Sequence, residues 1–146
     1  MRFKSLRKKR KEKEEKIEMK RLMEELRMSK LEEICGEEKK LYEVLSHTLF
    51  LNPSQLEKEG IEPLIERAKD YENKNEKIRA RITYHILGSL ALYHGNLELV
   101  QKYFSKCEEL SEGKLKEIYG FFLSRENAEK ALKFAQEYYR KVKPIS

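Results

Sequence analysis

The sequence predicts an all-α protein: a stack of about three antiparallel helical hairpins that follows a long, basic N-terminal helix. Three observations predict this fold. Apolar residues recur at three- and four-residue spacing along much of the chain, which is the period of an amphipathic helix. A tight turn at residues 94–96 separates two such stretches, and residues 12–33 contain strong helix formers without Gly or Pro. With 146 residues, the chain is long enough for one domain with a sizeable core.

The first eleven residues, MRFKSLRKKRK, form a dense cluster of positive charge without an acidic residue, and we call them the basic arm. Its seven basic residues are Arg2, Lys4, Arg7, Lys8, Lys9, Arg10 and Lys11. The rest of the chain has 25 basic and 26 acidic residues, so the basic arm accounts for the whole net charge of +6.

Residues 12–33 are expected to continue the basic arm as a helix of mixed charge. Their apolar residues form only a short stripe: Met19, Leu22, Met23 and Leu26. The three or four clean heptads that a coiled coil needs are missing. We therefore expect a solvated helix that docks on the domain or on a partner over a limited length, while self-association through the stripe stays open. Gly36 then marks a boundary between a segment at 1–36 and a helical-hairpin domain at 37–146.

Two helices are expected between Gly36 and the central turn. The first covers residues 37–51 with a full apolar face, and it ends there because the residue before Pro53 is disfavoured in the α conformation. A capping box at residues 54–57 opens a short helical turn. Pro63 lies near the first turn of the next helix, where its missing N–H costs nothing, and this helix continues to residue 72.

The central stretch, residues 80–110, is expected to form two helices joined by a turn at 94–96. Gly95 can adopt the left-handed conformation that ends a helix, and Asn96 can cap the next helix. The apolar stripe of the first helix combines Ile82, Ile86 and Leu90 with an adjoining row of Thr83, Leu87, Ala91 and His94. The stripe of the second helix consists of Leu97, Val100, Phe104 and Cys107, with Leu99, Tyr103 and Leu110 beside it. Helices joined by so short a turn pack antiparallel.

Two further helices are expected after residue 113, separated by a turn at 125–127. The chain then divides into three consecutive hairpins: 41–72, 79–111 and 114–142. Three such units are about the smallest stack that shares a continuous core.

The central hairpin carries a recognisable pattern. Its elements are Tyr84 at a large aromatic position, the Leu87-Gly88 pair, the turn at residues 95–97, and Phe104. In these positions residues 81–112 resemble a tetratricopeptide repeat, a helix–turn–helix unit of about 34 residues. Ala91, Cys107 and Glu112 depart from that pattern. The resemblance implies that another backbone approaches Gly88 closely, since a glycine inside a helix otherwise costs ~1 kcal/mol relative to alanine.

The resemblance also implies a binding surface, because in tetratricopeptide proteins the first helix of each unit lines a concave groove that holds a partner peptide. Carried over to this chain, the groove residues are His85, Ser89, Leu92 and Tyr93. The alternative is that these residues pack against the N-terminal helix or are simply exposed. His85 and Ser89 do not reproduce the Lys and Asn pattern by which chaperone-binding members hold a carboxylate.

The basic arm is the other candidate site. Its Lys and Arg side chains can neutralise phosphates and release counterions, which gives salt-dependent, sequence-independent binding to RNA or DNA. An acidic protein surface or an anionic membrane surface is an alternative target, and charge runs are commonly solubilising tails. The basic residues of the last helix, such as Arg140 and Lys141, interact favourably with the negative end of the helix dipole. Their presence is therefore explained without a binding partner.

Catalysis, cofactors and metals are not predicted. The chain has no glycine-rich phosphate loop, no GxSxG or HExxH motif and no Cys–His nucleophile signature. Cys35 and Cys107 form no CxxC pair, and His85 and His94 fall on opposite sides of one helix, so no set of metal ligands is expected. Without a membrane-length apolar run or a secretory signal, a cytoplasmic location is expected. The composition, with 40% charged residues, resembles thermophile usage.

The predicted function is therefore a non-catalytic interaction module or adaptor that binds a protein partner through the helical groove and the basic arm. The alternative is a nucleic-acid or ribonucleoprotein-associated protein, in which the basic arm is the main site and the hairpins support it.

Overall fold

The computed structural model describes residues 2–50 and 60–142, with side chains from Arg7 onward. These residues form α1 (Arg2–Cys35), α2 (Lys39–Thr48), α4 (Ile61–Asn73), α5 (Lys77–His94), α6 (Leu97–Glu109), α7 (Gly113–Gly120), the short 3₁₀ helix η1 (Phe121–Leu123) and α8 (Arg125–Lys141). They contain no strand, which confirms the all-α prediction for the described part of the chain. The predicted helix stop at Pro53 and the capping box at 54–57 lie outside the described residues.

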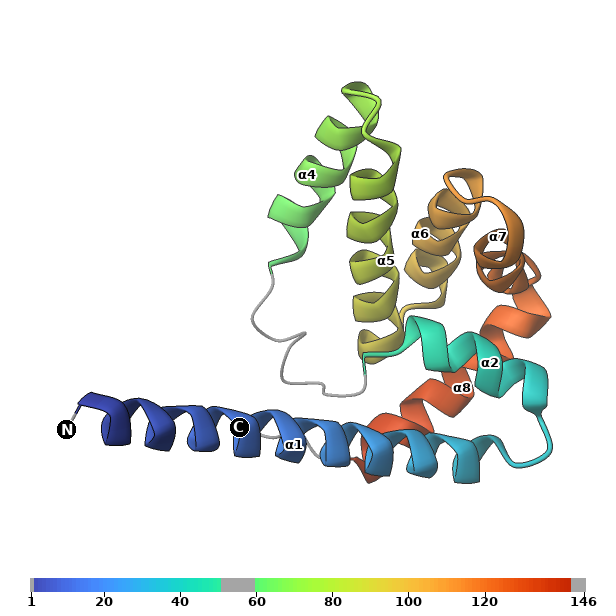
Figure 1. Ribbon diagram of the computed structural model, residues 1–146. Helices are drawn as coiled ribbons and strands as arrows, with labels where there is room; N and C mark the ends of the chain where they lie inside the picture. The colour runs from blue at the N-terminus through green and yellow to red at the C-terminus, as the bar shows by residue number, and fades with distance from the viewer. Residues whose placement is uncertain (1, 51–59, 143–146) are drawn as a thin grey trace.

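The helices form two groups (Figure 1). In the first, α4, α5, α6 and α7 stand side by side, and each packs on the next in the sequence. In the second, α1 runs along the base of the molecule, and α2 and α8 lie between α1 and the upright helices. Both α2 and α8 contact α1 and α5, so they join the two groups.

One predicted pairing is wrong, because residues 41–72 do not form a hairpin. α4 packs along α5, whereas α2 packs on α1, α5, α7 and α8. The amount of apolar surface explains this difference. α4 buries only Leu64 and Ala68, which one neighbouring helix can cover. α2 buries four of its ten residues and therefore needs several neighbours.

The central turn forms as the sequence predicts. Gly95 has a φ of +75°, the left-handed conformation that only glycine adopts without a steric penalty. The backbone N–H of Asn96 donates to the carbonyl of Ala91 at 3.0 Å, which closes the end of α5. The side chain of Asn96 in turn accepts a hydrogen bond from the N–H of Leu99 at 3.1 Å and caps α6. The two helices consequently run antiparallel (Figure 1).

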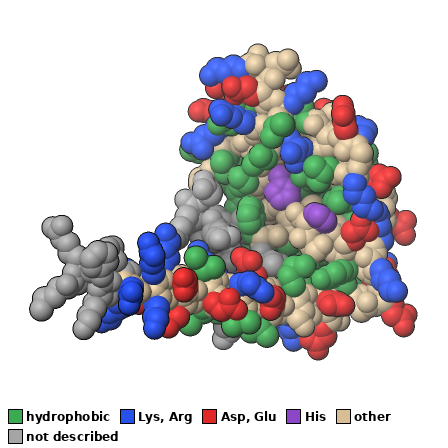
Figure 2. Space-filling view, viewed as in Figure 1, with side chains coloured by type: hydrophobic (Ala, Val, Ile, Leu, Met, Phe, Trp, Pro, Cys, Tyr) green, Lys and Arg blue, Asp and Glu red, His purple; other side chains and the backbone are tan. Residues whose placement is uncertain are grey.

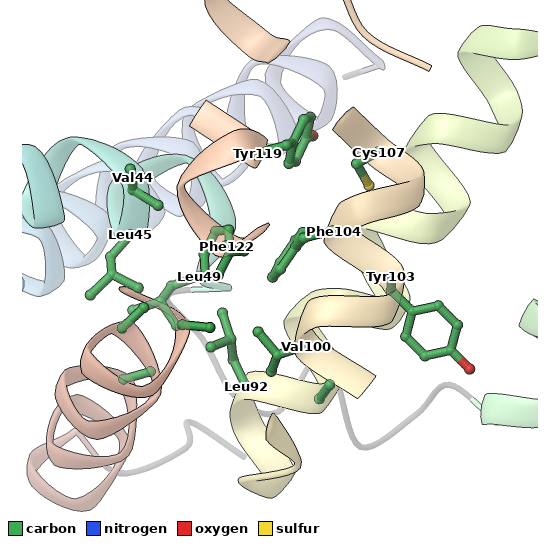
Figure 3. Packing of buried hydrophobic residues seen from close by; sticks show 14 of the residues in the cluster. Val44, Leu45, Leu49, Leu92, Val100, Tyr103, Phe104, Cys107, Tyr119 and Phe122 are labelled. Carbon is green, nitrogen blue, oxygen red and sulfur yellow. The ribbon is translucent and has the colours of Figure 1, made fainter. Parts of the chain in front are cut away.

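Gly88 makes room for an aromatic ring rather than for another backbone, which corrects the expectation drawn from the repeat resemblance. A Cβ atom at Gly88 would lie 2.6 Å from Cε1 of Phe104. The Phe104 ring stacks on Phe122, with ring centroids 4.4 Å apart, and on Tyr119, with centroids 5.9 Å apart. Figure 3 shows these rings together at the centre of the core. The glycine therefore positions the aromatic centre of the domain.

α1 is packed only near its C-terminal end. Leu31 and Cys35 are buried and belong to the hydrophobic core, where α1 contacts α2 and α8. Every side chain from Arg7 to Leu22 is exposed, and Leu26 is 70% exposed. The docked length is short, as predicted, but the core begins before the predicted boundary at Gly36.

The packed side of α5 agrees with the predicted stripe at Leu87 and Ala91, which are buried, and differs from it at its two ends. Leu90 is buried, but Ile82 is 48% exposed and His94 lies on the surface. The reason is that α4 and α6 flank the side of α5 that carries Leu87 and Ala91, so this side is the more deeply buried one.

Candidate functional site

The basic arm lies at the free end of α1 (Figure 2). Its described cations, Arg7, Lys8, Lys9, Arg10 and Lys11, are exposed and make no ion pair with any residue that the structure describes. The side chains of Arg2 and Lys4 lie outside the described set. Successive residues of an α-helix are rotated by about 100°, so the five described cations surround the helix instead of lining one face.

The same end of α1 carries the partial positive charge of backbone N–H groups that have no partner within the helix. The first turn of the helix contains no acidic residue. Its free N–H groups form the positive end of the helix dipole, so the cations of the basic arm lie in an unfavourable field. A bound anion would interact favourably with both the side chains and the dipole.

The chain itself covers the side of α5 on which the groove was predicted. Ser89 and Leu92 have no exposed surface. The hydroxyl of Ser89 donates to the carbonyl of Thr48 at the end of α2. The side-chain amide of Gln136 in α8 donates to the carbonyls of Leu92 and Tyr93. In this structure Ser89 and Leu92 therefore line no open groove, because α2 and α8 occupy that space.

His85 is half-buried and lies among aromatic rings. Its Nδ1 is 2.8 Å from the hydroxyl of Tyr119. The rings of Phe50, Phe104 and Tyr119 meet it edge to face, with centroids 5.8 to 6.3 Å away. Burial lowers the pKa of His85 from 6.5 to about 4, and the nearby Arg81 contributes in the same direction. His85 is therefore neutral at pH 7.

Tyr93, the fourth predicted groove residue, is half-buried near the end of α5. Its ring meets Tyr139 of α8 edge to face, with centroids 5.1 Å apart. The hydroxyl of Tyr139 donates to the carbonyl of Phe50 at 2.9 Å. α8 is thereby held against the segment that follows α2.

The opposite side of α5 is hollowed instead. There α4 and α6 flank α5 and leave two hollows that share Tyr103; we call this surface the α4–α6 groove. One hollow, of about 260 Å³, is lined mainly by charged and aromatic residues: Lys69, Glu72, Tyr84, Lys102, Tyr103 and Lys106. The other, of about 120 Å³, is lined mainly by apolar residues: Ile61, Leu87, Leu90, Ala91, Leu99 and Tyr103.

Sequence reasoning missed the α4–α6 groove, although part of it was visible. One face of α6 carries Leu99, Tyr103 and Lys106, because these residues are four and three positions apart. This row becomes the wall of a groove only because α4 lies across from it. The sequence prediction paired α4 with α2, and so it did not place α4 opposite this row of α6.

Other chemistry finds little support in the described residues. Among them, no group of three or more His, Cys, Asp or Glu side chains could hold a metal ion. Cys35 and Cys107 are free and buried. Burial raises the pKa of both thiols, that of Cys35 to about 11, so neither is a thiolate at neutral pH. In this part of the chain, none of the helices combines the length and the apolar composition that crossing a bilayer requires.

Comparison with protein-family models, with curated proteins and with solved structures found no match for this chain. The basic arm and the α4–α6 groove are therefore assigned as candidate sites from their geometry and charge alone.

Proposed function

We propose that this protein is a non-catalytic, nucleic-acid-associated protein, in which the basic arm is the main contact and the helical domain supports it. One observation carries the proposal: Arg7 to Lys11 are exposed, unpaired within the described residues, and distributed around the free end of one helix. Such cations bind phosphates through counterion release.

The distribution of charge around α1 favours a groove between phosphates over a flat surface. On a flat surface, only the side chains of one face of a helix can make contact. The major groove of B-DNA admits an α-helix, with phosphates on both sides of it. A membrane surface is less suitable, because Ile17 is the only apolar residue between Arg7 and Glu18, and an interfacial helix needs an apolar face.

The domain would hold the basic arm away from its own surface. Burial of Leu31 and Cys35 fixes the C-terminal end of α1 in the core. The exposed part from Arg7 to Leu22 is about 24 Å long at 1.5 Å per residue. This length lets the basic arm enter a groove while the domain stays outside it.

A charge-matched pair of variants tests the proposal. Replacing Arg7–Lys11 by Gln lowers the net charge from +6 to +1 and should abolish the mobility shift of a short duplex DNA or a single-stranded RNA at low salt. The control variant, with the same net charge of +1, replaces five exposed cations that have no ion pair in the described structure: Lys39, Arg67, Lys77, Arg79 and Lys133. The control should retain most of the binding. Equal loss in both variants, or no shift with the parent protein, would contradict the proposal.

The adaptor predicted from the sequence is a second candidate function. The α4–α6 groove favours it, because this groove offers an open surface for a protein partner on the side of α5 opposite to the four predicted residues. The resemblance of the sequence at residues 81–112 to a tetratricopeptide repeat points to the same candidate, since that family binds peptides.

A further inference from the structure

We propose that the α4–α6 groove binds a segment of a protein partner through one apolar and one acidic side chain of that segment. The inference is independent of the basic arm, which lies at the far end of α1. It rests on three properties of the groove: an apolar hollow, a lysine-bordered hollow beside it, and the hydroxyl group of Tyr103, which lines both hollows.

The smaller hollow is suited to one aliphatic or aromatic side chain. Its walls are the apolar side chains of α5 and α6, including Leu87, Leu90 and Leu99. An apolar cavity of about 150 Å³ in another protein accepts benzene, so the volume of about 120 Å³ here is sufficient for a side chain such as leucine. Ile61 at the edge is 38% exposed and would be covered by the ligand.

The larger hollow has an excess of positive charge. Glu72 lies within it, but its carboxylate accepts a hydrogen bond from Tyr84 and is 3.7 Å from Nζ of Lys106. Lys69 and Lys102 lie on opposite walls, both are exposed, and neither has an ion pair among the described residues. A carboxylate placed between these two lysines would meet two unpaired cations.

Tyr103 supplies a hydrogen-bond donor between the two hollows. Its side chain is 4% exposed, and its hydroxyl has no partner within the part of the chain that the structure describes. Figure 3 shows Tyr103 pointing away from Val100 and Phe104, out of the central core. Because Tyr103 lines both hollows, its hydroxyl can donate a hydrogen bond to a ligand carboxylate. Burial raises the pKa of Tyr103, which keeps the hydroxyl protonated as a donor.

A protein segment fits this combination better than a nucleic acid does. The smaller hollow is lined mainly by apolar side chains and contains no Lys or Arg to meet a phosphate, and the ring of Tyr103 is too deeply buried for a base to stack on it. Along α6, Leu99 and Lys106 are about 10 Å apart at 1.5 Å per residue. An amphipathic helical segment with its apolar and acidic side chains three to five residues apart would reach both hollows.

A random 12-residue peptide library displayed on phage provides the probe. We expect selection on the full-length protein to enrich peptides with Leu, Ile, Met or Phe three to five positions from Asp or Glu. The affinity of an enriched peptide is then measured by fluorescence anisotropy. Replacing its acidic residue by the corresponding amide, or its apolar residue by Ala, should weaken binding at least tenfold.

Matched variants of the protein locate the site. Lys69→Gln with Lys102→Gln should weaken the selected peptide at least tenfold, and Tyr103→Phe should weaken it severalfold without affecting the fold. Lys39→Gln with Lys133→Gln removes the same charge elsewhere and should leave the affinity unchanged. The amide peptide should bind the Lys69/Lys102 variant and the parent with equal affinity. The reason is that the change in the peptide and the change in the protein remove the same interaction.

Three outcomes would overturn the proposal. The first is a library selection that enriches no such pattern. The second is binding that survives the Lys69/Lys102 change but is lost when Arg7–Lys11 are replaced by Gln, which would place acidic peptides on the basic arm. The third is a nucleic acid whose affinity falls with the Lys69/Lys102 change while peptide affinity does not, which would assign the groove to nucleic acid.

Discussion

α1 and α5 are the two longest helices in the described structure, and they are stabilised in opposite ways. α5 buries nine of its 18 residues between α2, α4, α6 and α8. α1 has 34 residues, and from Arg7 onward, where side chains are described, only Leu31 and Cys35 are buried. The consecutive cations Arg7 to Lys11 therefore lie where packing contributes least. Changes around α5 should affect stability and leave nucleic-acid binding intact, and changes in the basic arm should do the reverse.

The largest expected effect on stability is at the aromatic centre of the core. Phe104 is fully buried, so Phe104→Ala should lower the free energy of unfolding by about 3–5 kcal/mol. Urea denaturation followed by circular dichroism measures this change. Nucleic-acid binding by the fraction that remains folded should equal that of the parent. A loss below about 1 kcal/mol would mean that Phe104 is not packed as described.

His85 should make stability depend on pH. Its pKa is about 4 in the folded protein, below its ordinary value of 6.5, so the unfolded chain takes up a proton first as the pH falls. The contribution of His85 is complete above pH 6.5 and decreases by about 3 kcal/mol on going down to pH 4. We expect the free energy of unfolding of the parent to fall more steeply over this range than that of His85→Gln. Parallel pH profiles would contradict the lowered pKa of His85.

Two glycines give a matched test of packing at α5. Gly88→Ala places a Cβ 2.6 Å from the Phe104 ring, whereas Gly120→Ala meets only Cγ of Glu108, at 4.0 Å. Overpacking typically costs about 1–3 kcal/mol, and the better helix propensity of alanine returns about 1 kcal/mol. Gly88→Ala should thus destabilise by up to about 2 kcal/mol, while Gly120→Ala is stabilising by up to about 1 kcal/mol. Thermal unfolding of the two variants side by side would show the difference, and equal melting temperatures would exclude it.

The smallest expected change in stability is in the basic arm. Replacing Arg7–Lys11 by Gln removes exposed side chains that make no ion pair in the described structure, so the free energy of unfolding should change by less than about 0.5 kcal/mol. Removing cations from the N-terminal end of a helix can even stabilise that end slightly. A larger loss by urea denaturation would show that the arm packs on the domain.

Local features of the fold were predictable from the sequence, and long-range pairings were not. The end of α5 at Gly95 and the Asn96 cap depend on neighbouring residues, and both were predicted correctly. The pairing of α2 with α4 was predicted wrongly, because adjacency in the sequence does not decide which apolar faces meet. α2 has enough apolar surface for several neighbours, and the sequence alone does not order them. The resemblance to a tetratricopeptide repeat stays a prediction.

For the candidate sites too, the sequence was sufficient for local features and insufficient for long-range contacts. The basic arm is a property of consecutive residues, so the sequence was sufficient to identify Arg7 to Lys11. The groove predicted at Ser89 and Leu92 required knowing what covers α5, and α2 and α8 cover that side. The α4–α6 groove brings Lys69 near Lys102, two residues 33 positions apart, through a pairing that the sequence did not reveal.

The salt dependence of nucleic-acid binding tests the central proposal most directly. For duplex DNA, each neutralised phosphate contributes about −0.9 to the slope of log Kobs against log salt concentration, so seven contacts give a slope of up to about −6. Replacing Arg7–Lys11 by Gln should reduce the steepness by up to about 4.5. The charge-matched control should keep most of the parent slope. Equal slopes for the parent and the Arg7–Lys11 variant would show that the basic arm does not bind phosphates, and would contradict the proposed function.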